Sequence, residues 1–116
     1  MPDFRPATLL RLHFCERDEY HGKPLHRCLI EKCRELQMTR VTAMRGLEGY
    51  GGESEIHRSR PVHRNLPIVI SVIDVPEKID RLIPMVQEMM DTGLIATSPV
   101  TILSLNRARR LTTAAS

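Results

Sequence analysis

The spacing of hydrophobic residues along the chain predicts four strands and two helices. Apolar and polar residues alternate over 8–14, as in a strand that is covered on one side only. After Pro24, which is well tolerated in a first helical turn, apolar residues recur at helical spacing on one face. The predicted elements are strands over 8–14, 41–45, 68–73 and 100–105, and helices that begin at Pro24 and Asp74.

The third predicted strand, Ile68–Ile73, is apolar on both faces except at Ser71. Such a strand is covered on each side. The order strand, helix, strand, strand, helix, strand is the split βαβ pattern, which closes as an antiparallel four-stranded sheet with both helices on one face. The other face would remain open, and the doubly apolar strand indicates that self-association buries it.

The second helix carries signals at both ends. Asp74 and Glu77 are three residues apart, the spacing of a capping box, and Pro76 fits the first turn. Pro84 lies inside the helix and removes one hydrogen bond of its ladder, so we expect a kink there. Gly93 follows the last apolar residues and predicts a left-handed stop.

A glycine-rich and then polar segment separates the second and third strands. In a compact domain, a connection of this length is usually functional or disordered. Gly49, Gly51 and Gly52 would let backbone N–H groups approach an anion closely, although a flexible hairpin arm explains these glycines equally well. We expect a projecting arm over about 47–64 and an ordered core over about 8–106.

Length and cysteine content fit a single domain in a reducing compartment. The chain has 116 residues, and its cysteines are odd in number, without CxxC pairing. No apolar run approaches the ~18 residues of a membrane span. These features predict one domain over 1–116 and a cytoplasmic location.

Positive charge is concentrated in two places. The formal net charge is +3, and the arginines of interest are Arg58, Arg60 and Arg64 near the arm and Arg107, Arg109 and Arg110 near the end of the chain. Two such clusters could converge on one phosphate-bearing ligand, since the arginine fork holds oxyanions well. Arginines at loops and tails also simply keep a small protein in solution.

Several kinds of chemistry lack support in the sequence. RNA-binding domains share this element order, but none of the four aromatic residues lies in the third strand, so nucleic acid is not an expected partner. The five histidines show no HExxH or paired Cys/His spacing, and no nucleophile motif or Walker loop occurs. Glu53, Glu55 and His57 alternate in the arm and could serve as acid and base groups or ligate a cation, but the polarity of the arm favours solvation. We therefore predict neither a catalytic residue nor a metal site.

Several motifs, taken in order, resemble those of the PII-like signalling proteins. The resemblance is stronger to the bacterial and archaeal family of domain of unknown function 190, which is regarded as PII-like. It covers about residues 8–106. The motifs that carry it are Gly22-Lys23-Pro24-Leu25, Arg45-Gly46-Leu47-Glu48-Gly49-Tyr50-Gly51, Ile56-His57, Leu66-Pro67-Ile68-Val69-Ile70 and Gly93-Leu94-Ile95.

The resemblance implies a ferredoxin-like βαββαβ sandwich assembled as a homotrimer, with sheet faces turned inward and one long T-loop projecting from each subunit. In PII proteins a nucleotide binds in the cleft between subunits. Carried over by motif, the ligand-binding residues are Gly49, Gly51, Gly93, Arg107 and Arg109. The arm that would contact a partner carries Glu53, Glu55, His57, Arg58 and Arg60.

This chain departs from the PII pattern at three places. Gly51 is followed by Gly52-Glu53 instead of Arg-Gln, which argues against direct sensing of 2-oxoglutarate. Residues 54–60 contain no tyrosine that could be modified. Leu94 stands where PII proteins have a lysine, which removes one phosphate contact.

The sequence therefore predicts a non-enzymatic, trimeric regulatory protein. Its ligand would be a small anion, most reasonably an adenine nucleotide (ATP, ADP or AMP), with no firmly implied cofactor. A membrane transporter or channel is the suggested partner, because members of the resembling family are often encoded beside fluoride-channel genes. The competing interpretation is a trimer similar to copper-tolerance proteins that binds a divalent metal through His57 or His63 with Glu55, and a third is a trimer that hydrolyses a nucleotide.

Overall fold

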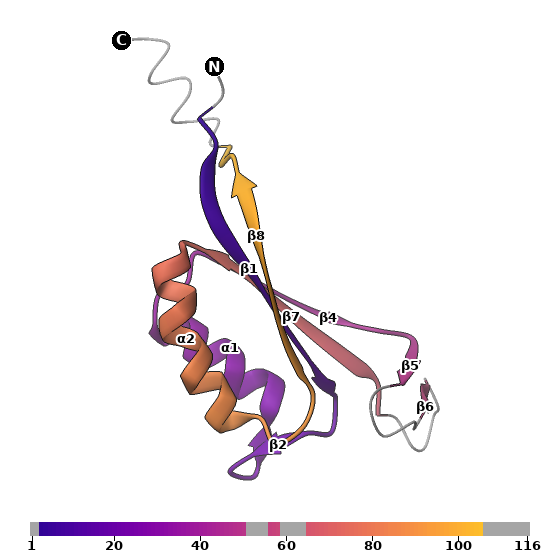
Figure 1. Cartoon of the computed structure of the whole chain (residues 1–116). Helices are drawn as coiled ribbons and strands as arrows, with labels where there is room; N and C mark the ends of the chain where they lie inside the picture. Colours follow the sequence, from indigo (N-terminus) through magenta and orange to yellow (C-terminus); the bar gives the residue numbers. More distant parts are fainter. Residues whose placement is uncertain (1–2, 51–55, 59–64, 106–116) are drawn as a thin grey trace.

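The computed structural model describes residues 3–50, 56–58 and 65–105, and for 48–50 and 56–58 it describes the backbone only. Two helices and eight strands are present in this part of the chain (Figure 1). They are β1 (Arg5–Cys15), β2 (Glu19–Tyr20), β3 (Lys23–Pro24), α1 (Leu25–Glu35), β4 (Arg40–Arg45), β5 (Glu48–Tyr50), β6 (Ile56–Arg58), β7 (Pro67–Asp74), α2 (Pro76–Met89) and β8 (Leu94–Ile102).

The main sheet has four strands in the order β4-β7-β1-β8, and every neighbouring pair is antiparallel. Both helices cover the same face of this sheet (Figure 1). The predicted α+β, ferredoxin-like βαββαβ fold is confirmed. The edge strands β4 and β8 are separated by β7 and β1, which fixes where the connecting segments leave the sheet.

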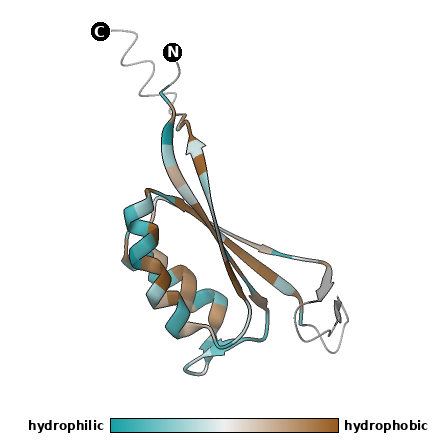
Figure 2. Ribbon diagram, in the orientation of Figure 1, coloured by the Kyte–Doolittle hydropathy of each residue, from teal (hydrophilic) through white to brown (hydrophobic). Residues whose placement is uncertain are grey.

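The hydrophobic core lies between the helices and one face of the sheet. Alternate residues of β1 and β7 enter it, and hydrophobic residues run along β7 and along the sides of the helices that face the sheet (Figure 2). The fully enclosed side chains come from both layers: Leu10, Leu12, Ile70, Val72, Leu25, Leu29, Cys33, Ile79, Leu82 and Val86. On β7 the intervening residues, among them Val69 and Ile73, are only half-buried and face away from the helices.

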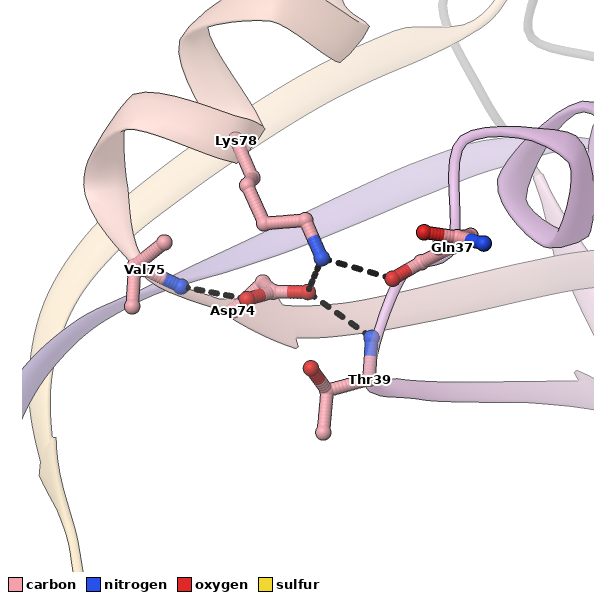
Figure 3. A network of polar contacts seen from close by, with 5 residues as sticks. All are labelled: Gln37, Thr39, Asp74, Val75 and Lys78. Carbon is pink, nitrogen blue, oxygen red and sulfur yellow. Dashed lines mark hydrogen bonds and ion pairs between the residues drawn. The ribbon is translucent and has the colours of Figure 1, made fainter.

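The start of α2 differs from the predicted capping box. The helix begins at Pro76 with Val75 as its N-cap, and no side chain caps it. Asp74 is instead the last residue of β7 and is buried, and its carboxylate accepts hydrogen bonds from the backbone N–H groups of Val75 and Thr39, each at 2.8 Å (Figure 3). Lys78 Nζ lies 3.5 Å from Asp74 Oδ2. The carboxylate therefore links two turns of the chain. It satisfies a backbone N–H group from each turn, whereas a helix cap would satisfy donors of the helix alone.

Two further segments differ from the prediction. The fourth strand of the sheet, β8, runs from Leu94 to Ile102 and therefore begins six residues earlier than expected, with Pro99 inside it. Pro99 is tolerated because β8 is an edge strand. The arm is not irregular throughout, since β5 and β6 pair antiparallel within it.

Candidate functional site at the base of the arm

The arm leaves the sheet after β4 and rejoins it at β7. Backbone contacts hold together its two roots, which are the chain around Gly46 and the chain around Pro67. The N–H of Gly46 donates to the carbonyl oxygen of Pro67 at 2.7 Å. A Cβ at Gly46 would lie only 2.8 Å from Pro67 Cγ, so a side chain there would force the two roots apart. Gly46 is therefore required for close approach.

The corner after β1 ties both roots of the arm to the sheet. The Glu16 N–H donates to the carbonyl of Leu66 at 2.8 Å, and the Arg17 N–H donates to Asn65 Oδ1 at 2.9 Å. On the other root, Arg45 Nε lies 3.3 Å from Glu16 Oε2, an ion pair that lacks hydrogen-bond geometry. This corner was not predicted, because no spacing rule links residues so distant along the chain.

The short β5–β6 ladder brings together residues that the sequence assigned to different roles. Gly49, predicted to bind a ligand, pairs with His57, and Glu48 pairs with Arg58. His57 and Arg58 were predicted to contact a partner. The base of the arm thus places one predicted ligand-binding position directly beside two predicted partner-binding positions.

Gly93 lies in the turn between α2 and β8 and is pressed against the end of β1. Its φ is +114°, a conformation that favours glycine, so the predicted left-handed residue is confirmed. A Cβ at this position would collide with the carbonyl oxygen of His13 and lie 3.1 Å from Met90 Cε. The helix itself already ends at Met89, so Gly93 shapes the turn rather than the helix end.

Gly93 and the base of the arm share one end of the sheet but lie at its opposite edges. Gly93 precedes β8, whereas Gly46 follows β4, and three strand spacings separate these edge strands. At ~4.8 Å per spacing, the separation is about 14 Å. Within one subunit the two glycine turns are therefore well separated.

The remaining predicted site residues lie outside the described part of the chain: Gly51, Glu53, Glu55, Arg60, Arg107 and Arg109. β8 has nine residues and ends at Ile102, about 27 Å from its start beside Gly93. The chain that leads to Arg107 and Arg109 therefore leaves β8 at the end of the sheet opposite the arm base.

A separate surface hollow of about 240 Å³ lies between the β2–β3 hairpin, α1 and the end of α2. Tyr20 and His21 stack at its rim with ring centroids 3.9 Å apart, and Lys23 and Glu31 also line it. None of the predicted site residues lines this hollow. The described residues also contain no group of three or more His, Cys, Asp or Glu that could hold a metal ion, and none of their helices is long and apolar enough to cross a membrane.

The fold defines a class of protein, an α+β ferredoxin-like domain, and the comparisons place the chain more narrowly. Residues 7–102 match the family DUF190, described as "Uncharacterized ACR, COG1993", and the chain belongs to this family. It is 32% identical over 99 residues to a UPF0166 protein of Aquifex aeolicus, covering 84% of this chain and 93% of that protein.

Solved structures with a similar fold include a PII-like protein. The structure of CPII bound to ADP and bicarbonate, from Thiomonas intermedia K12, superposes with a TM-score of 0.67 at 13% identity, covering 90% of this chain and 95% of that one. The divalent ion tolerance protein CutA1 from Ehrlichia chaffeensis gives a TM-score of 0.54 at 12% identity, covering 89% and 87%. At these identities the likeness establishes the fold, which is PII-like.

Proposed function

We propose that this protein is a single-domain, PII-like regulatory protein that forms a homotrimer and binds an adenine nucleotide in the clefts between subunits. The observation that carries the proposal is the division of the site. The arm base and the Gly93 turn lie at opposite edges of one sheet, so a neighbour that brings its other edge alongside would complete the cleft. The similar fold of a protein bound to ADP supports the choice of ligand.

Each residue has a definite task in this cleft. Gly49 and Gly51 at the arm base present backbone N–H groups to the phosphates of the ligand, and the Gly93 turn of the adjoining subunit closes the other side. Arg107 and Arg109 supply the charge, since a guanidinium can hold phosphate oxygens with two parallel hydrogen bonds. Because β8 ends at the end of the sheet opposite the arm base, we assign both arginines to the cleft of a neighbour.

The arm would transmit the bound state to a partner. Glu53, Glu55, His57, Arg58 and Arg60 are the polar residues that could contact it, and the β5–β6 ladder connects them to the ligand side of the arm. A membrane transporter or channel that presents a surface to the cytoplasm is the proposed partner. No catalytic step is assigned to the protein.

Thermal unfolding with candidate ligands tests the proposal. ADP, AMP or ATP at 100 times its dissociation constant should stabilise the native protein by about 2.7 kcal/mol. Arg109→Ala should weaken this binding by about 1.5–3 kcal/mol, the range of hydrogen bonds to charged groups. Arg110→Ala is the matched control and should act only as diffuse surface charge that added salt removes. Equal effects of the two variants would contradict the proposed site.

The second candidate is a trimer that binds a divalent metal, which the fold shared with a divalent ion tolerance protein favours. Its ligands would be His57 or His63 with Glu55, none of whose side chains lies in the described part of the chain. Stabilisation by Cu²⁺ or Zn²⁺ without stabilisation by nucleotides would favour this candidate. Release of inorganic phosphate from ATP would favour a nucleotide hydrolase.

A further inference from the structure

The open face of the sheet has a largely polar row between two rows of mixed apolar and polar residues. Residues in register across antiparallel strands point to the same side, and those that alternate with the buried core residues face away from the helices. In the order β4, β7, β1, β8 the rows are Arg40–Ile73–Leu9–Ser98, Thr42–Ser71–Arg11–Ala96 and Met44–Val69–His13–Leu94. Met44 and Leu94 are 54% and 58% exposed in the single subunit.

All the fixed charge in these three rows is positive. Arg40 lies on the edge strand β4, where water can still reach it, but Arg11 lies on the inner strand β1 between β7 and β8. No position in the rows is acidic. Among the described residues, the Arg11 guanidinium makes no ion pair. The hydroxyls of Ser71, directly opposite Arg11, and of Thr42, one strand further on, make no hydrogen bond there either.

Association of subunits through this face would bury the charge of Arg11. If the proposed trimer turns these open faces inward, like faces meet, and the three rows of every copy bring the same cations without a carboxylate. A buried charge without a partner is strongly destabilising. The counter-charge must then come from a group that is not part of the face.

We propose that Arg11, with the hydroxyls of Ser71 and Thr42, binds a free inorganic oxyanion such as phosphate inside the interface between copies of this chain. The guanidinium offers two parallel donors to the anion, and the two hydroxyls lie in the same row as additional donors. The inference rests on the proposed trimer. This interfacial anion site is separate from the nucleotide cleft, because it lies on the sheet face and not at the arm base.

Sedimentation velocity over a dilution series tests the site with inorganic phosphate as the probe. The parent trimer is compared in phosphate and in chloride at equal ionic strength. Phosphate should lower the protein concentration of half-dissociation by at least tenfold. Arg11→Met should abolish the difference between the salts, because it removes both the donor fork and the charge that needs neutralising. Arg40→Met, at the edge of the same face, is the matched control and should keep the difference.

The outcomes separate this inference from the proposed function. If Arg11→Met keeps the phosphate effect and Arg109→Ala loses it, phosphate acts at the nucleotide cleft and the inference is overturned. A parent trimer that is indifferent to phosphate also overturns it, since Arg11 then reaches water by extending over the small Ala96 past the β8 edge. A parent that is monomeric at micromolar concentration overturns the proposed trimer itself.

Discussion

Asp74 Oδ2 accepts a hydrogen bond from the backbone N–H of Thr39 at 2.8 Å, which joins the end of β7 to the turn that leads into β4 (Figure 3). The same carboxylate accepts the N–H of Val75, and Lys78 Nζ beside it donates to the carbonyl of Gln37 at 2.6 Å. One buried side chain thus connects the exits of α1 and β7 with the start of α2. Gln37 has a φ of +57°, and this network helps to hold that turn in place.

Removing the carboxylate should destabilise the fold. Asp74→Ala leaves two backbone donors without an acceptor, and we expect the free energy of unfolding to fall by about 1.5–3 kcal/mol at pH 7. Lys78→Met is the control, and it should cost at most about 1 kcal/mol because its ion pair is partly exposed. Urea denaturation of the two variants measures both values, and equal losses would contradict the central role of Asp74.

The network also predicts how stability depends on pH. Burial alone would raise the pKa of Asp74, but the hydrogen bonds from Thr39 and Val75 and the charge of Lys78 outweigh it and hold the pKa below its ordinary value of 3.8. The stabilisation is therefore complete above pH 3.8 and is lost as the pH falls through the lower folded pKa. Asp74→Ala should flatten the acid limb of a stability profile below pH 4, and an unchanged limb would contradict this assignment.

Two glycines with positive φ should respond very differently to alanine. At Gly93 a Cβ collides with the His13 carbonyl oxygen, whereas at Gly22, with a φ of +78°, nothing lies within 4 Å. Gly22→Ala should cost only the strain of the left-handed conformation, about 1–2 kcal/mol. Gly93→Ala should cost clearly more, about 3 kcal/mol or above, because the turn must also move away from β1. Chemical denaturation measures the loss of unfolding free energy in each variant. Similar losses would show that the Gly93 turn moves away from β1 at little cost.

Adjacent residues of β7 separate folding from assembly. Ile70 is fully buried against the helices, while its neighbour Val69 lies on the open face between Met44 and His13. Ile70→Lys should unfold the subunit, since it buries an unpaired charge. Val69→Lys should leave a folded monomer. Circular dichroism with light scattering distinguishes the two, and a stable Val69→Lys trimer would contradict burial of the open face by self-association.

The two cysteines of α1 should differ in reactivity. Burial raises the pKa of the Cys33 thiol to about 11, so only about one thiol in a thousand is ionised at pH 8. Cys28 is half-buried, with its Sγ 3.9 Å from the Tyr20 carbonyl oxygen. Alkylation at pH 8 followed by mass spectrometry should modify Cys28 well before Cys33. Equal rates in the native protein would mean that α1 opens readily.

Hydrophobic spacing predicted the elements that are held by the core. β1, α1, β7 and α2 were found because each directs a regular set of apolar residues inward, and the order of the elements was sufficient to give the fold. β4 was also predicted, although only Val41 of this edge strand is even half-buried. The first half of β8 was missed, since small and polar residues follow Leu94 and Ile95 on this edge strand and Pro99 interrupts the pattern. Asp74 was wrongly assigned to a helix cap. Its carboxylate accepts a hydrogen bond from Thr39, 35 positions away, and local spacing cannot reveal such a contact.

The site was predictable only in part, for a related reason. The glycine pattern identified the arm base and the Gly93 turn, because a positive φ or a close approach of the backbone requires glycine at that one position. The contacts of Glu16 and Arg17 with the arm could not be predicted in this way, since their hydrogen bonds to Leu66 and Asn65 use backbone N–H groups that nearly every residue type has. The placement of the two glycine turns at opposite sheet edges follows only from the strand order.

The most direct test of the central claim is calorimetry with ADP on trimers that mix two defective subunits. Gly51→Val damages the arm base, and Arg109→Ala removes the arginine that a neighbour is proposed to supply. At an ADP concentration that saturates the parent, neither variant alone should bind appreciably. After the two are unfolded together and refolded at equal amounts, random assembly should restore intact clefts at about a quarter of the interfaces, and ADP binding should return to that extent. No return of binding in mixed trimers would contradict a nucleotide cleft shared between subunits.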